Sequence, residues 1–117
     1  MMEPKQIAQL AARALDANKG SEIVCLKVDE MTVLTDYMVI ATGHSVPHVK
    51  ALAAHVEEAL DKEEIFARRK EGLSEGHWCI LDYGDVMVHI FHEKDREYYQ
   101  LERLWSDGSN DVAYEEE

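Results

Sequence analysis

Apolar side chains near the start of the chain follow the spacing of an amphipathic helix. Between Pro4 and Asn18 they recur every three or four positions, at Ile7, Leu10, Ala11, Ala14 and Leu15. This spacing puts them on one side of a 3.6-residue helix, so the segment predicts a helix that packs by that side. Gly20 is a stop signal for it.

Two further helices are predicted later in the chain. One runs from Ser45, a suitable N-cap, to about Glu64, with Pro47 tolerated in its first turn. Its apolar stripe is Val49, Leu52, Ala53, Val56 and Leu60. The other runs from Lys94 to Leu104 and places on one side Tyr98, Leu101 and Trp105.

Extended segments lie between these helices. Ile23–Val28 and the almost wholly apolar Tyr37–Thr42 predict strands, the second buried on both faces, and the polar residues 29–36 connect them. Ile65–Lys70 predicts a short edge strand. Three basic residues in this segment discourage pairing with another chain: Arg68, Arg69 and Lys70.

Trp78–Asp82 and Asp85–Phe91 predict a β-hairpin closed by Tyr83 and Gly84. A two-residue turn pairs Asp82 with Asp85 and Trp78 with His89. One face then gathers Trp78, Ile80, Met87, His89 and Phe91, and the other gathers Cys79, Leu81, Val86, Val88 and Ile90. We expect the second face to lie in the core. The first face includes Trp78 and His89, whose side chains end in polar groups, so we expect it to be half covered or used for docking.

The order of these elements predicts an α/β fold, with a mixed sheet of about five strands and flanking helices. A chain of 117 residues has room for one domain, which we expect at residues 1–105. After Trp105 the chain holds five acidic residues and no basic one. Residues 106–117 therefore predict an acidic, disordered tail.

The net charge of the chain restricts the kinds of partner that it can bind. Twenty-four acidic and 12 basic residues leave a net charge of −12, so the electrostatic field repels nucleic acid and attracts basic proteins. The one basic cluster, residues 68–70, is flanked by acids that cancel its field, namely Glu63, Glu64 and Glu71.

The cysteines and the apolar runs indicate the compartment. Cys25 and Cys79 lie in apolar runs and form no Cys-x-x-Cys pair, which favours free thiols in a reducing environment. The longest unbroken apolar stretch, Tyr37–Ala41, is far too short to cross a membrane. We expect a cytoplasmic protein without membrane contact.

The best candidate for catalysis is the loop Gly43-His44-Ser45, between a buried strand and a helix. It is similar to the entry loop of nucleotidyltransferases, but no carboxylate follows before Glu57, so metal ligands for phosphoryl transfer are missing. Ser45 is better explained as a helix cap than as a nucleophile. Asp82 and Asp85 form a carboxylate pair across a turn, where Asp is favoured for its own hydrogen bonds.

The six histidines show no ligand spacing on any one predicted element. His48 and His55 lie about 10 Å apart along a helix, too far to share one zinc ion. His89 and His92 point to opposite faces of a strand. The residues therefore predict no catalytic site, no metal site and no cofactor.

Several motifs are similar to one known family. Leu34-Thr35-Asp36-Tyr37 with Met38–Gly43, and then His48–Ala51 and Ala54–Glu57, closely resemble the ribosomal silencing factor (Iojap-related) family. The second half fits that family's C-terminal signature at Glu71-Gly72, Trp78, Leu81–Val86, Val88-His89, Arg96, Tyr98-Tyr99, Leu101-Glu102 and Leu104-Trp105. The resemblance covers the chain from the first helix to Trp105.

The resemblance implies a nucleotidyltransferase-like fold without the catalytic carboxylates. It also implies that the protein binds ribosomal protein fourteen of the large subunit and blocks joining of the small subunit when nutrients are short. The family's contact surface corresponds to Trp78, Leu81, Asp82, Tyr83, Gly84, Asp85, Val88 and His89. One conflict follows, because the predicted pairing puts Leu81 and Val88 on the opposite face from Trp78 and His89.

Two other functions stay open on the sequence. The Gly43–Ser45 loop leaves room for a nucleotide-binding or nucleotidyl-transferring enzyme. A dimerisation module is the third interpretation, and a homodimer is compatible with each of the three. The acidic charge disfavours nucleic acid and favours a basic protein as the partner. Trp78 would be the aromatic anchor of that interface, and Asp82 and Asp85 would face basic side chains of the partner.

Overall fold

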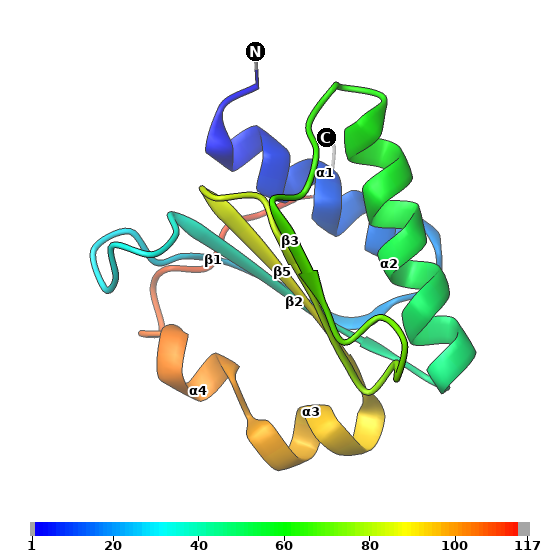
Figure 1. The fold of residues 1–117 in the computed structure, drawn as a ribbon. Coiled ribbons are helices and arrows are strands. Elements are labelled where there is room, and N and C mark those ends of the chain that lie inside the picture. Colours follow the sequence, from blue (N-terminus) through cyan, green and yellow to red (C-terminus); the bar gives the residue numbers. More distant parts are fainter. Residues whose placement is uncertain (1, 115–117) are drawn as a thin grey trace.

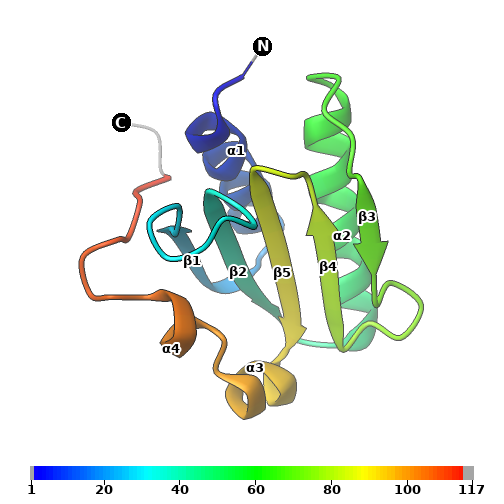
Figure 2. The same ribbon diagram turned by 60° about the vertical axis from the view of Figure 1, so that its left-hand side comes forward.

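Five strands form one sheet in the order β1-β2-β5-β4-β3 (Figures 1 and 2). The computed structural model describes residues 2–114. Its strands are β1 Ser21–Lys27, β2 Tyr37–Gly43, β3 Arg69–Glu71, β4 Trp78–Asp82 and β5 Val86–His92. β2 and β5 pair in parallel and the other neighbours pair antiparallel, so the predicted mixed sheet is confirmed.

Two long helices, α1 (Pro4–Ala17) and α2 (Val46–Asp61), cover one face of the sheet (Figure 1). Their predicted apolar stripes form most of the contact, and the buried side chains include Ala11, Leu15, Leu52 and Val56. Ser45 caps α2, because its Oγ accepts a hydrogen bond from the His48 N–H at 3.1 Å. α2 ends at Asp61, three residues before the predicted end, and Glu64 then takes a positive φ of 60°.

Two short helices, α3 (Glu93–Tyr99) and α4 (Glu102–Trp105), lie on the other face. The single helix predicted over Lys94–Leu104 is wrong, because Gln100 adopts a left-handed conformation (φ 47°) that ends α3. Leu101 and Trp105 pack on a second core of Leu26, Val28, Met38, Ile40 and Phe91. Tyr98, expected beside them, is 80% exposed.

Arg96 of α3, and not an aromatic residue, is the side chain that this part of the chain buries. It is 5% exposed. Its Nη1 donates to Thr42 Oγ1 of β2 at 3.0 Å, and its Nε donates to the Glu102 carboxylate of α4 at 3.1 Å. Arg96 therefore ties both short helices to the centre of the sheet.

The β4–β5 hairpin has a different turn from the predicted one. Tyr83 N–H donates to the Val86 carbonyl, so Gly84 and Asp85 form the turn, and Trp78 pairs with Phe91 instead of His89. Gly84 takes a φ of +86°, which a glycine adopts without strain. Because this shift moves the register by two positions, each residue keeps its face, and the two predicted faces are confirmed.

Residues 110–114 of the predicted tail run beside β1. Lys27 N–H donates to the Asn110 carbonyl at 2.9 Å, Val112 N–H donates to the Cys25 carbonyl at 2.8 Å, and Val112 packs on the first core. This differs from the disorder expected from composition, because the free edge of β1 offers these backbone groups partners. Residues 115–117 lie outside the described residues, and the domain division at residue 105 stays a prediction.

The two cysteines are free and buried, as predicted. Burial raises the pKa of the Cys25 thiol to about 12 and raises the pKa of the Cys79 thiol as well. Neither thiol is therefore set up as a nucleophile. Within residues 2–114, no helix is long and apolar enough to cross a bilayer.

The position of Arg96 yields a stability prediction. We expect Arg96→Met to lower the free energy of unfolding by about 2 kcal/mol, because Glu102 loses its partner while staying only one-third exposed. Arg103→Met, which changes an exposed arginine on α4, is the control and should change stability by less than about 0.5 kcal/mol. Urea unfolding measures both, and equal effects would contradict the role given to Arg96.

Candidate docking surface

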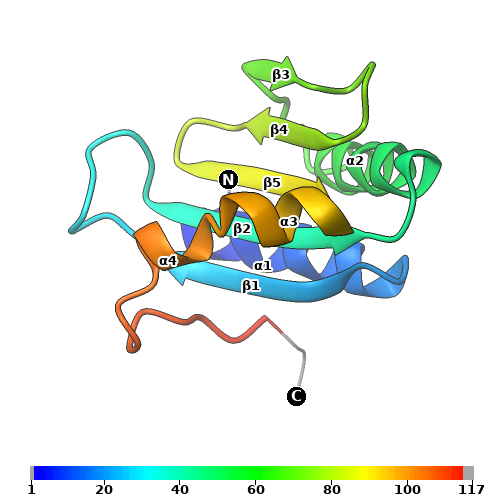
Figure 3. The same ribbon diagram turned by 90° about the horizontal axis from the view of Figure 1, so that it is seen from below.

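The sheet face opposite α1 and α2 is only partly covered. In Figures 2 and 3, α3 and α4 lie over β2 and the end of β5, and no helix lies in front of β4 or β3. The side chains that β4 and β5 place on this side of the sheet, which we call the open face, are Trp78, Ile80 and Asp82 of β4 with Met87 and His89 of β5. All but the buried His89 are half-buried, so apolar surface remains for a partner.

Trp78 is the centre of an aromatic cluster on the open face. Its ring lies 4.8 Å from that of Phe91 and 4.7 Å from that of Tyr99, measured between centroids. Its indole N–H donates to His89 Nδ1 at 3.1 Å. Since that polar group is already used inside the protein, Trp78 offers a partner its ring surface and no hydrogen bond.

His89 is held neutral beneath this cluster. Burial lowers the pKa of its imidazole to about 4. Because Nδ1 accepts from Trp78, the proton of the neutral ring sits on Nε2, which is buried without a hydrogen-bond partner among the described residues. His89 therefore positions Trp78 and does not itself reach the surface.

A second apolar element lies beside the β4–β5 turn. The N–H groups of Asp36 and Tyr37 donate to the Asp85 carbonyl at 2.9 and 3.0 Å, which places the 29–36 loop next to the turn. Val33 and Leu34 of this loop are 102% and 77% exposed. The prediction of a polar connection gave these two residues no role in contact with a partner, although two adjacent apolar residues in a polar segment were the available signal.

The charges around the turn are mixed. Asp82 Oδ1 accepts the Gly84 N–H at 2.8 Å, and Arg69 lies opposite Asp82 in the ladder. A Cβ on Gly84 would lie 3.0 Å from the guanidinium carbon of Arg68, so that base covers the turn. The chain's own arginines therefore lie beside the acidic pair Asp82 and Asp85, which the sequence predicts to face basic groups of a partner.

The eight residues expected to contact a partner do not share one surface. Trp78, Asp82 and His89 belong to the open face, and Gly84 and Asp85 form the turn. Leu81 and Val88 are 0% exposed beneath α1 and α2, where a partner of the folded protein does not reach them. Tyr83 packs on the same core, and burial, with the nearby charges of Glu57 and Asp61, raises the pKa of its phenol.

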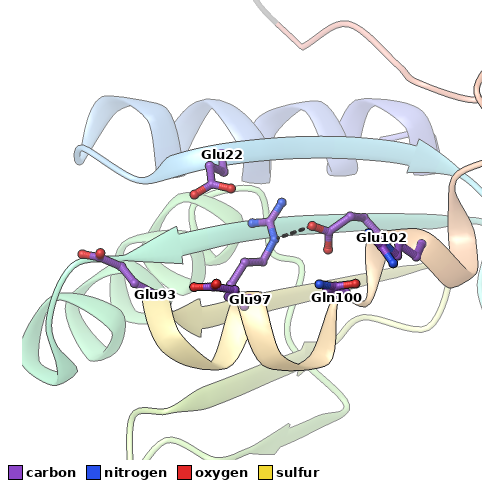
Figure 4. Close-up of a pocket in the computed structure, with 7 residues that line it drawn as sticks. Glu22, Glu93, Glu97, Gln100 and Glu102 are labelled. Carbon is purple, nitrogen blue, oxygen red and sulfur yellow. Dashed lines mark hydrogen bonds and ion pairs between the residues drawn. The ribbon is translucent and has the colours of Figure 1, made fainter.

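The Gly43–Ser45 loop shows no geometry for nucleotide binding. Ser45 caps α2, and the His44 N–H donates to His48 Nδ1 at 3.0 Å. His44 also contacts Glu93, at 2.9 Å, on the rim of a cleft of about 440 Å³. Four carboxylates line that cleft, those of Glu22, Glu93, Glu97 and Glu102, against the two guanidinium groups of Arg96 and Arg103 (Figure 4). The excess of negative charge disfavours phosphate there.

Comparisons with known proteins identify relatives over nearly the whole chain. The family model described as "Ribosomal silencing factor during starvation" matches residues 1–117. The "Ribosomal silencing factor RsfS" of Bacillus subtilis is 37% identical over 106 residues, 91% of this chain and 90% of that protein. A crystal structure of a Chromobacterium violaceum protein superposes with a TM-score of 0.87 at 37% identity, covering 97% of this chain and 96% of that one.

The neutral state of His89 predicts a loss of stability in acid. As the pH falls from 6.5 towards 4, the unfolded chain takes up a proton that the folded chain does not, so the free energy of unfolding falls. We expect a loss on the order of 2 kcal/mol between about pH 7 and pH 4.5 from this group.

The variant His89→Gln isolates that contribution, because a glutamine carbonyl still accepts from Trp78 and does not titrate. Urea unfolding of both proteins at the two pH values measures the difference. An equal pH dependence in the two proteins would show that His89 is not held neutral in the fold.

Proposed function

The chain belongs to the ribosomal silencing factor family of ribosome-associated regulators of translation, and we propose that it binds the large subunit through ribosomal protein fourteen. Bound there, it keeps the small subunit from joining and so lowers translation when nutrients are short. The described residues measure 32 × 31 × 30 Å along their principal axes. A protein of that size, bound on the surface of the large subunit that the small subunit must touch, blocks joining by its volume alone. The proposed action needs no catalytic turnover and takes place in the cytoplasm.

The observation that carries this proposal is the open face with the exposed apolar residues around it. Val33 and Leu34 extend it at the turn end, and Tyr98, Tyr99 and Leu104 extend it on the side of α3 and α4. Half-buried aromatic residues at the centre of an apolar patch are typical of the residues that dominate binding energy. Trp78 is therefore the anchor of the proposed interface.

Burial restricts the residues to which we assign contact with the partner. We assign contact to Trp78, Asp82 and Asp85, which are half-buried or exposed. Leu81, Val88 and the packed Tyr83 support the hairpin from the helical side, so changing them would disturb docking only through the fold.

The net charge contributes mainly to the rate at which the protein and its partner associate. A net charge of −12 attracts a basic ribosomal protein over the Debye length and repels bare ribosomal RNA. Once docked, Asp82 and Asp85 face the partner together with Arg68 and Arg69, so charge selects orientation more than it adds affinity. Binding should therefore weaken with salt mainly through a slower association rate.

Two substitutions test the surface. We expect Trp78→Ala to weaken binding to large subunits by about 2 kcal/mol or more, roughly thirty-fold. Because Trp78 also packs on the second core, Leu34→Asp is the cleaner variant. Its side chain is 77% exposed, so the fold tolerates the change, and we expect binding to weaken at least tenfold.

His55→Asp, on the exposed side of α2, is the matched control and should bind like the unchanged protein. Cosedimentation with purified large subunits measures binding, and light scattering of mixed subunits measures joining. Unchanged binding of Leu34→Asp and Trp78→Ala, with both folds intact, would place the contact on another face. Normal joining in the presence of excess protein would end the proposed function itself.

A further inference from the structure

Three side chains with metal-binding chemistry meet at the end of the hairpin opposite the turn. His77 immediately precedes β4, His92 ends β5, and Asp95 lies in the first turn of α3. The His92 N–H donates to the His77 carbonyl at 2.9 Å, which continues the ladder beyond the Trp78–Phe91 pair. The three residues are therefore held by backbone structure from three separate elements.

Their ligand atoms are close enough to share one ion. One atom from each of His77, His92 and Asp95 lies within 4.8 Å of the others. His77 Nδ1 and Asp95 Oδ2 are 3.4 Å apart. Bonds of about 2.0–2.1 Å in a tetrahedral zinc site separate neighbouring ligands by roughly 3.3 Å, so this pair already has the required spacing.

We propose that His77, His92 and Asp95 bind a divalent transition-metal ion, with zinc as the occupant. Two imidazole nitrogens and one carboxylate oxygen suit zinc, whereas calcium and magnesium prefer ligand sets made only of oxygen. His77 is exposed and His92 and Asp95 are half-buried, so the ion reaches them from solvent and water completes its coordination.

Two of the remaining histidines make other contacts within the fold. His44 contacts Ser21 and Glu93 through its two ring nitrogens, at 2.8 and 2.9 Å. His48 accepts from the His44 N–H and contacts the Asn18 carbonyl. Within residues 2–114, the triad is the one cluster of three such ligands, and the acidic character of the chain favours a cation there.

An ion at this site would join the open end of the hairpin to α3. His77 adjoins Trp78, and α3 carries Tyr98 and Tyr99, so the ion would hold the aromatic cluster in one arrangement. Zinc would thereby stabilise the folded chain against α3 detaching from the sheet. Any effect on ribosome binding would rest on the proposed function, whereas metal binding itself does not.

Calorimetric titration of the chelator-treated full chain with zinc chloride tests the site. We expect one ion per chain and a rise in the unfolding temperature. His77→Gln and Asp95→Asn should each weaken zinc binding at least tenfold, the loss that even outer-shell partners of metal sites produce. His55→Gln, which removes an exposed histidine elsewhere, should bind zinc like the unchanged chain. Cobalt in place of zinc should give the visible absorption of a tetrahedral ion.

The proposal is overturned if the unchanged chain takes up no zinc, or if His77→Gln binds it equally well. Loss of binding in His44→Gln with none in His77→Gln would also overturn it, because the ion would then lie at the His44–Glu93 contact. Leu34→Asp separates the two proposals. It should lose ribosome binding and keep its zinc affinity, so either proposal can fail alone.

Discussion

The parallel pairing of β2 with β5 is the constraint on which the arrangement of this protein depends. Parallel strands begin at the same edge of a sheet, so the residues that precede β2 meet those that precede β5. The 29–36 loop therefore hydrogen-bonds to the Asp85 carbonyl beside the turn. At the other edge, the loop after β2 meets the start of α3, where His44 contacts Glu93. One pairing thus separates an end that carries the exposed Val33 and Leu34 from an end rich in histidine.

Coverage of the second sheet face depends on a single buried cation. Arg96 donates to Thr42 and Glu102, and these bonds, with the packing of Leu101 and Trp105 on the second core, hold α3 and α4 over β2 and the end of β5. α3 (seven residues) reaches the start of β4, where Tyr99 packs on Trp78 with 4.7 Å between ring centroids, and the rest of β4 has no helix in front of it (Figure 2). Trp78 consequently stays half-buried, with part of its side chain exposed to solvent.

Much of this fold follows from local periodicity. The stripes of α1 and α2, the buried β2 strand and the two faces of the hairpin were predicted because burial repeats every 3.6 or every two residues. The faces survived a wrong turn because the register moved by an even number of positions. The contact set was less accurate, since family motifs combine residues that fold the chain, such as Leu81 and Val88, with residues that face outward, such as Trp78.

The sequence by itself determined α1, α2, the buried β2 strand, the two faces of the hairpin, the free cysteines and the acidic charge, because each depends on residue type and short-range spacing. Only the tertiary structure decided that the 29–36 loop lies beside the turn, that Arg96 and not Tyr98 is buried, and that His77 meets His92 and Asp95. These contacts depend on strand register and on one left-handed residue, Gln100. Their energies come from groups distant in sequence, which no local pattern records.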